Sequence, residues 1–226
     1  MIGTHLNRQQ LSQQFFDNLM DSPSRNITKQ MSVEVYPAYK VLRLDGRLAE
    51  RPNDYELVLV NTISKEIAYY VDVALLDSRI EGKQAIHPLV YRSTNAAHSI
   101  ALEGFGSSIL FDCLVPHHTV ILADGNHWDG GQFVWASRVS KAIGYGRKTY
   151  FIESDGALRR LNSHSDHQAL NNELWDEDSG EQINLAVISK AELSGKADRD
   201  LLMRQLAGRM TVVTDRLILA GQPTSR

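Results

Sequence analysis

The 226-residue sequence has a single cysteine, Cys113, and only six prolines. One cysteine cannot form an internal disulfide, so a disulfide-stapled scaffold is excluded and a reducing compartment is favoured. No run of 18 apolar residues occurs, which excludes a membrane-spanning helix of ordinary length. The first residues lack a basic segment followed by an apolar core. We therefore expect no export signal, no membrane partner and a cytoplasmic location.

The sequence also has no large excess of charge of one sign. Its 24 Lys and Arg residues against 27 Asp and Glu residues give a net charge of −3. The basic residues are dispersed, and the tightest groups are Arg147-Lys148 and Arg159-Arg160. Because nucleic-acid-binding domains usually present a basic face, we do not expect a nucleic-acid partner.

Metal-ligand spacing is lacking as well. His117-His118, His127 and the segment 163–167 contain histidines, but none shows the spacing of a zinc site, so no metal is expected. The lone Cys113 falls on the apolar side of an expected helix. Such a cysteine is typical of a buried, inert thiol rather than a nucleophile.

Hydrophobic residues make up 42% and charged residues 23% of the chain, which is typical of a globular protein with a real core. Hydrophobic periodicity and turn residues predict the secondary structure. Strands are expected at 33–45, 55–63, 67–75, 84–92, 118–123, 148–153, 157–161, 183–188 and 211–219, and helices at 5–21, 104–115, 132–143 and 191–210. The polar segments 163–167 and 175–181 are interpreted as loop or linker. This order predicts an α+β (mixed α/β) fold.

The most informative segment is a glycine turn between an expected strand and an expected helix. Gly104 and Gly106 lie where that helix begins, within Gly104, Phe105, Gly106, Ser107 and Ser108. Without Cβ atoms they let a ligand approach the backbone, and the first N–H groups of a helix can bind a pyrophosphate. Those five residues are the predicted cofactor-binding set, with hydroxyl donors at the two serines. The alternative is that both glycines only allow tight packing of helix on sheet.

The turn fits none of three common loop signatures. No Gly-Lys-Ser/Thr follows it, so it is not a Walker A loop, and it lacks the third glycine of the dinucleotide fingerprint. It also places no serine between the glycines of a nucleophile elbow. It does resemble the acyl-CoA motif of the GNAT superfamily of N-acetyltransferases, Gln/Arg-x-x-Gly-x-Gly/Ala. Gly104 and Gly106 match this motif, whereas Ala101 stands where the family has Gln or Arg.

The resemblance extends over residues 33–161. The antiparallel hairpin before the turn and the strand, helix and strand after it follow the order of the superfamily. The stretch at 122–125, the helix around Trp135 and the hairpin at 150–156 are similar to divergent GNAT-like proteins of bacteriophages. The resemblance implies a central, mostly antiparallel sheet with helices on both faces as an acyl-CoA-binding domain at 33–161. It leaves an N-terminal helix and linker at 1–32 and a C-terminal α/β extension at 162–226.

The resemblance implies a reaction and the residues for it. In this superfamily an amine attacks the thioester of acetyl-CoA or another acyl-CoA directly, a base takes the amine proton and an acid protonates the leaving thiolate. Tyr145 stands where the family often has its acid, and Glu103 and His87 are the candidate bases. Two of them have a structural alternative: Tyr145 as a half-exposed aromatic at a helix end, and His87 as a structural histidine. Alternation along the strand places His87 on the face opposite the core.

An acyltransferase of this kind would act on a protein or a small amine, in the host cytoplasm if the chain is phage-encoded. Two other functions remain open from the sequence. Alternatively, a catalytically inactive GNAT-like scaffold could bind a bacterial host protein, which the missing Gln or Arg at position 101 motivates. Tyr91-Arg92-Ser93 has a faint similarity to ADP-ribosyltransferases. The Glu-x-Glu that these enzymes need later in the chain is lacking at a suitable spacing.

Overall fold

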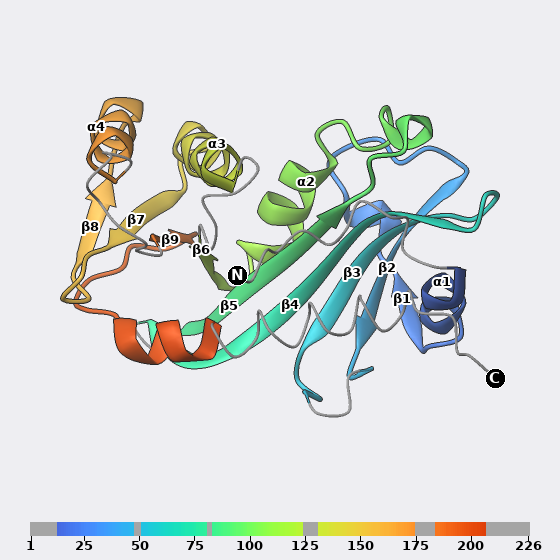
Figure 1. The fold of residues 1–226 in the computed structure, drawn as a ribbon, viewed down its shortest axis with the longest axis horizontal. Coiled ribbons are helices and arrows are strands. Elements are labelled where there is room, and N and C mark those ends of the chain that lie inside the picture. The colour runs from blue at the N-terminus through green and yellow to red at the C-terminus, as the bar shows by residue number, and fades with distance from the viewer. Residues whose placement is uncertain (1–12, 48–50, 81–82, 124–130, 175–183, 207–226) are drawn as a thin grey trace, which may run out of the picture. The chain divides into compact units, whose positions relative to one another are not determined.

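The computed structural model describes residues 13–47, 51–80, 83–123, 131–174 and 184–206. These residues form a mixed α+β structure with one large, mostly antiparallel open sheet and few helices, as Figure 1 shows. The strand order is β1-β2-β3-β4-β5-β6-β9-β7-β8. The α+β class expected from the sequence is therefore confirmed.

The described chain divides into two compact units. The first unit contains Pro88–Cys113 and the described residues before Leu76, and the second contains Leu76–His87 and Leu114–Leu206. Strands β4 (Glu66–Ile80) and β5 (Lys83–Arg92) contribute to both units. The boundaries predicted at 32/33 and 161/162 differ from this division and stay predictions.

The first unit is an antiparallel meander with a helix on each face. Its strands are β1 (Ser24–Asn26), β2 (Tyr39–Asp45), β3 (Tyr55–Asn61) and the first part of β4, joined as successive antiparallel pairs. The antiparallel pairing of β3 with β4 confirms the predicted hairpin. Both strands are rich in the β-branched and aromatic residues that pack on a pleated surface. Residues 33–38 were expected to be extended but form no strand, and Pro37 lies within them.

Alternation along β4 places neighbouring tyrosines on opposite faces. The ring of Tyr70 lies 5.5 Å from that of Phe15 on α1 (Gln13–Met20). The ring of Tyr69 lies 5.3 Å from that of Phe105 on α2 (Phe105–Ser108). A six-residue π-helix, Ile109–Leu114, continues α2. The segment at 104–115 was thus predicted correctly as helical, but not its π-helical second half.

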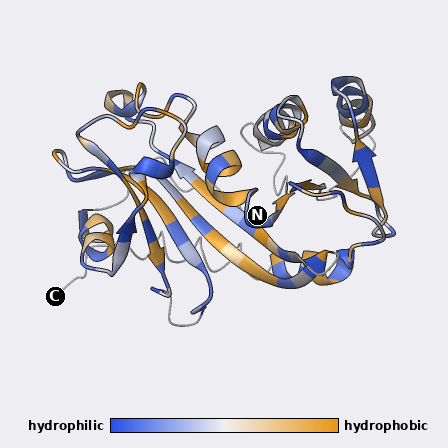
Figure 2. Cartoon of the chain, turned by 180° about the vertical axis from the view of Figure 1, so that it is seen from behind, coloured by the Kyte–Doolittle hydropathy of each residue, from blue (hydrophilic) through white to orange (hydrophobic). Residues whose placement is uncertain are grey.

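The second unit joins β5 to β6 (Thr119–Ala123) as a parallel pair, Ala85 to Thr119 and Ile86 to Val120. Strand β9 (Leu185–Ser189) runs antiparallel to both β6 and β7 (Lys148–Ile152), and β8 (Leu158–Leu161) completes the edge. Helix α3 (Gly131–Gly144) contacts β7 and β9. One cluster of buried residues includes Leu202 and Leu206 from a helical segment at 199–206. Figure 2 shows hydrophobic segments alternating with hydrophilic ones along the long strands β4 and β5.

The polar segment at 163–167 was predicted as loop, and this prediction is wrong. Helix α4 (His164–Leu174) begins there. The Ser163 hydroxyl accepts from the Asp166 N–H at 3.1 Å, and the Asp166 carboxylate accepts from the Ser163 N–H at 3.1 Å. This reciprocal cap supplies partners for groups that a helix start leaves unpaired, so a polar sequence begins a helix. The expected strand at 211–219 lies outside the described residues.

Candidate functional site

The glycine turn lies in the first unit and has a left-handed residue at its centre. Gly104 has a φ of +68° and precedes α2, a conformation that glycine adopts without steric cost. Its carbonyl oxygen accepts from the N–H groups of Ser107 at 3.0 Å and Ser108 at 3.1 Å. The N–H groups of Gly104, Phe105 and Gly106 donate to no acceptor among the described residues. Three neighbouring backbone donors at the start of this helix thus have no acceptor among the described residues.

Gly106 has a packing role that the sequence left open as an alternative. A Cβ built on Gly106 would lie 2.8 Å from the Tyr69 hydroxyl oxygen. Tyr69 is buried, and Phe105, which packs on it, is only 1% exposed. The missing side chain at position 106 therefore allows α2 to approach β4 closely. At Gly104 a Cβ would meet only Val33 Cγ1, at 3.4 Å.

The two serines of the turn differ in what surrounds them. Ser107 is half-buried. The Ser108 hydroxyl is buried, donates to the Asp112 carboxylate and accepts from the Ser32 N–H at 3.2 Å. The same Ser32 N–H lies 3.0 Å from Asp112 Oδ2. Ser108 thus links the segment before β2 to the π-helix.

The predicted acid and base candidates lie in different units. Glu103 is exposed beside the glycine turn in the first unit. Tyr145, in the second unit, follows α3 and is 62% exposed. His87 on β5 is buried, and its Nδ1 lies 3.1 Å from the Ile121 carbonyl oxygen. The sequence predicted that His87 lies on the face opposite the core. In the structure His87 shares its face with Ala85, which belongs to the second unit's core, and both faces of β5 are covered.

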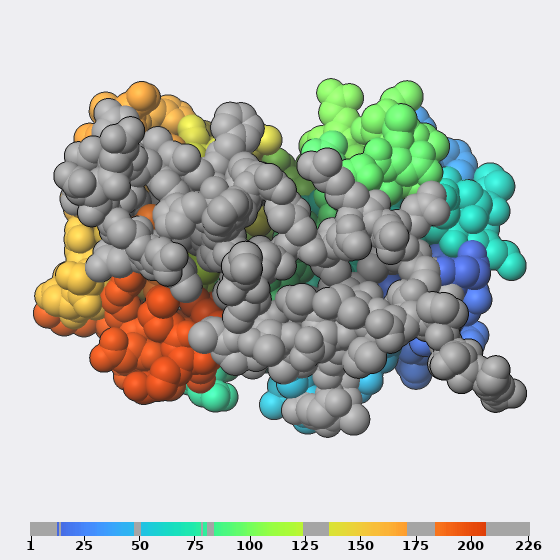
Figure 3. All heavy atoms as spheres, in the orientation of Figure 1, coloured from blue at the N-terminus to red at the C-terminus, as the bar shows by residue number. Residues whose placement is uncertain are grey.

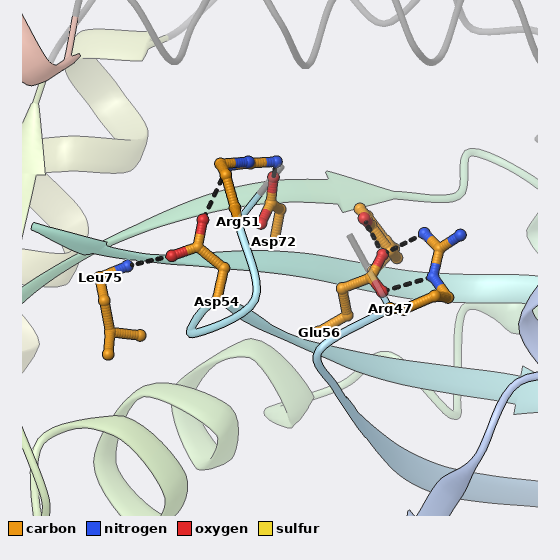
Figure 4. Close-up of polar contacts among 7 residues, drawn as sticks. Arg47, Arg51, Asp54, Glu56, Asp72 and Leu75 are labelled. Carbon is orange, nitrogen blue, oxygen red and sulfur yellow. Dashed lines mark hydrogen bonds and ion pairs between the residues drawn. The ribbon is translucent and has the colours of Figure 1, made fainter. Parts of the chain in front are cut away.

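Sequence reasoning missed a cluster of buried charged side chains on β3, β4 and the preceding loop, which Figure 4 shows. Its carboxylates Asp54, Glu56 and Asp72 are each less than 5% exposed. Glu56 and Asp72 are direct partners across the two antiparallel strands. Like charges at such positions destabilise a sheet unless cations neutralise them. The signal was present as acidic residues within apolar strands, preceded by two arginines.

Arg47 neutralises Glu56. Its Nε and Nη2 donate to the two carboxylate oxygens at 2.6 and 2.5 Å, a two-pronged geometry that only arginine offers. The Tyr70 hydroxyl donates to Glu56 Oε1 at 2.5 Å. Burial, followed by the nearby Glu56 carboxylate, raises the pKa of Tyr70 well above its ordinary value. The hydroxyl therefore keeps its proton and remains a donor.

Arg51 joins the other two carboxylates. Its Nη2 donates to Asp72 Oδ2 at 3.0 Å, and its Nη1 lies 3.0 Å from Asp54 Oδ2. Asp54 Oδ1 accepts from the Leu75 N–H at 2.8 Å. The buried Asp72 Oδ1 accepts no hydrogen bond from any described residue. Burial raises the pKa of Asp72, and Arg51 only partly offsets this effect.

This shift predicts how pH acts on stability. A carboxyl whose folded pKa is raised stabilises the fold fully below its unfolded value, 3.8, and loses that contribution as the pH rises through the folded value. We expect Asp72→Asn, which cannot ionise, to become progressively more stable relative to the wild type as the pH rises above about 4. Urea midpoints measured across pH check this.

Asp45→Asn is the matched control of opposite sign. Although burial alone would raise the pKa of Asp45, Arg43 and Arg25 together lower it. The wild type should therefore gain stability over Asp45→Asn as the pH rises through the Asp45 pKa. The assignment for Asp72 fails if both variants change in the same direction.

The remaining predicted features concern cysteine, metals and the membrane. Burial, with Asp112 nearby, raises the pKa of the Cys113 thiol to about 11, and its Sγ lies 3.8 Å from Met31 Sδ. The thiol is thus protonated at neutral pH and a weak nucleophile. Within the described ranges, no three His, Cys, Asp or Glu side chains gather as a metal site would require. None of the helices described has the length and apolarity to cross a bilayer.

Comparisons with protein-family models, with curated proteins and with solved structures gave no match.

Proposed function

We propose that the chain is a GNAT-like acyltransferase that binds an acyl-CoA through the glycine turn and transfers the acyl group to an amine. The observation that carries this proposal is the set of three backbone N–H groups, at Gly104, Phe105 and Gly106, that donate to no described acceptor. Such groups at the start of a helix suit the negative oxygens of a pyrophosphate. Figure 3 shows green atoms, which belong to the segment around residue 100, at the molecular surface.

The order of the elements supports the same proposal. An antiparallel meander ends in β5, the turn and α2 follow, and the chain returns as β6, parallel to β5. Helix α3 and strand β7 come next. This is the order that the resemblance to the superfamily implies. The pairing of β5 with β6 ends at Ile86. Pro88 follows two residues later and has no N–H to donate to a neighbouring strand.

Two of the acid and base candidates are accessible for the proposed chemistry. The amine nitrogen attacks the thioester carbonyl, the C–S bond breaks, a base takes the amine proton and the thiolate receives a proton. Glu103, in the same unit as the turn, is exposed and can accept a proton. Tyr145 is also exposed but belongs to the other unit, so its role as the acid is implied by the resemblance alone. His87 is buried with Nδ1 beside a carbonyl oxygen, which suits it less to contact a substrate.

The experiment adds the side chain that the motif lacks. Ala101 is half-buried at the turn, and Ala101→Arg supplies the guanidinium that the family uses for pyrophosphate. A charge-assisted hydrogen bond contributes about 1.5 kcal/mol or more, so we expect acetyl-CoA to bind about 10-fold more tightly than to the wild type. Calorimetric titration of both proteins with acetyl-CoA measures the change.

Ala96→Arg is the matched control, because it adds the same charge at an exposed position of the short turn before the motif. It should leave the affinity near that of the wild type. Equal tightening by both variants would reduce the effect to general electrostatics and contradict a site at the turn. No binding by the wild type or Ala101→Arg at millimolar acetyl-CoA would overturn the proposal and leave the host-protein-binding scaffold as the alternative.

A further inference from the structure

A chain of hydrogen-bonding side chains lies outside the glycine turn and the buried charge cluster. His98, at the end of the 3-10 turn η2 (Ala96–His98), is 1% exposed and lies between a tyrosine and a glutamate. Its Nδ1 lies 2.9 Å from the Tyr39 hydroxyl on β2, and its Nε2 lies 3.4 Å from Glu66 Oε2 at the start of β4. A buried imidazole thus connects a buried phenol to a carboxylate.

The partners determine which ring nitrogen carries the proton in neutral His98. An ionised carboxylate only accepts hydrogen bonds, so Nε2 carries the hydrogen that faces Glu66. Nδ1 then accepts from the Tyr39 hydroxyl. The other Glu66 oxygen lies 3.4 Å from Asn95 Nδ2, which holds the carboxylate toward the ring. The Glu66 side chain is 30% exposed, so it connects the buried ring to solvent.

Tyr39 has a second acceptor within reach. Its hydroxyl oxygen lies 3.5 Å from the Ala97 carbonyl oxygen. When a proton from solvent binds His98 at Nδ1, the new N–H can donate to the Tyr39 oxygen, and the hydroxyl hydrogen can turn to Ala97. His98 therefore gains a proton and a positive charge without leaving a buried donor unpaired, and the adjacent Glu66 carboxylate balances that charge.

We propose that His98 is a proton-operated latch that holds η2 against β2 and β4 more tightly when it is protonated. Two contacts become stronger in that state: the 3.4 Å contact of Nε2 with Glu66 becomes an ion pair, and Tyr39 gains a hydrogen bond to the backbone of η2. The titratable groups that face the His98 ring are Tyr39 from β2 and Glu66 from β4, and the neutral Asn95 lies beside Glu66. The latch holds whether or not the chain binds acyl-CoA.

The latch is linked to the glycine turn through the backbone. The His98 carbonyl oxygen accepts from the Leu102 N–H at 3.0 Å, and the His98 and Ser99 N–H groups donate to Asn95 and Ala96 at 3.0 and 3.1 Å. These three amides report on how firmly the segment is held. Protonation of one ring thereby stabilises the segment that leads into Gly104.

Hydrogen exchange of these amides, measured by NMR at about pH 5.5 and 7.5, tests the latch in the intact protein. After correction for intrinsic exchange, we expect several-fold greater protection of the His98, Ser99 and Leu102 amides at the lower pH. Nitrogen-15 shifts should show the hydrogen on Nε2 in the neutral ring. Equal protection at both values, or a neutral ring with its hydrogen on Nδ1, would overturn the proposal.

Variants separate the latch from a general effect of pH. Glu66→Gln removes the balancing charge and should abolish the pH dependence of protection, and Tyr39→Phe should reduce it. Glu103→Gln removes an exposed carboxylate beside the same segment and should leave it unchanged. If Glu66→Gln retains the full dependence, or Glu103→Gln loses it, the site is not His98 with Glu66. Near-ultraviolet circular dichroism of each variant shows that it folds.

Discussion

Gly156→Ala is expected to lower the free energy of unfolding by about 3–5 kcal/mol, because two separate costs coincide at one position. Gly156, between β7 and β8, has a φ of +84°, a conformation that L-residues rarely adopt. A Cβ on it would lie 2.2 Å from the Ala197 carbonyl oxygen. The clash is with backbone whose N–H donates to the Gly156 carbonyl oxygen at 2.8 Å. Urea unfolding of the variant measures the loss.

Gly195→Ala separates backbone strain from the clash. Gly195 has a φ of +88°, close to that of Gly156, but a Cβ there would meet nothing within 4 Å. Only the left-handed conformation then costs free energy, so a loss of about 1–2 kcal/mol is expected. Equal losses in the two variants would show that the approach of Ala197 to Gly156 contributes little to stability.

The strands could be predicted from the sequence because their signal is local. Two segments rich in β-branched and aromatic residues, Tyr55–Asn61 and the residues after Glu66, flank a short polar turn. This pattern alone favours a hairpin. The helix predicted at 132–143 is also found, as Gly131–Gly144, and Val139 and Ala142 are buried on it.

Features that depend on distant residues could not be predicted in the same way. The sequence places β9 late in the chain, but only the folded structure shows that it enters between β6 and β7. The cap of α4 could have been predicted, since Ser163 and Asp166 stand three residues apart, as in a capping box. It was missed because the helix that follows is mostly polar, so hydrophobic periodicity gave no signal.

The candidate site shows the same division. The position of the glycine turn followed from two glycines between a strand and a helix, and the left-handed Gly104 fits that prediction. The contact between Gly106 and Tyr69 joins residues 37 positions apart and follows from how α2 packs on the sheet. Likewise, the burial of His87 depends on elements that cover both faces of β5.

Glu56→Ala is expected to lower the free energy of unfolding by about 3–5 kcal/mol, the cost of breaking a buried ion pair by removing one partner. The Glu56 side chain is 1% exposed and accepts three hydrogen bonds, two from Arg47 and one from Tyr70. Its removal leaves Arg47, whose side chain is only 21% exposed, without its carboxylate. It also leaves a buried hydroxyl without an acceptor. Urea denaturation at neutral pH measures the change.

Two comparisons show whether burial causes this loss. Asp45→Ala removes a carboxylate that also binds two arginines, Arg25 and Arg43, but is 46% exposed, so the loss should be about 1 kcal/mol or less. Replacing the buried group together, as Arg47→Met, Glu56→Leu and Tyr70→Phe, removes the unpaired charge as well as its partner. This triple variant should regain most of the stability that Glu56→Ala loses, because apolar groups of similar size can replace a buried pair without penalty. If it is as unstable as Glu56→Ala, the loss arises from packing around Arg47 and Phe15, whose ring lies 5.6 Å from the guanidinium carbon, rather than from the stranded charge.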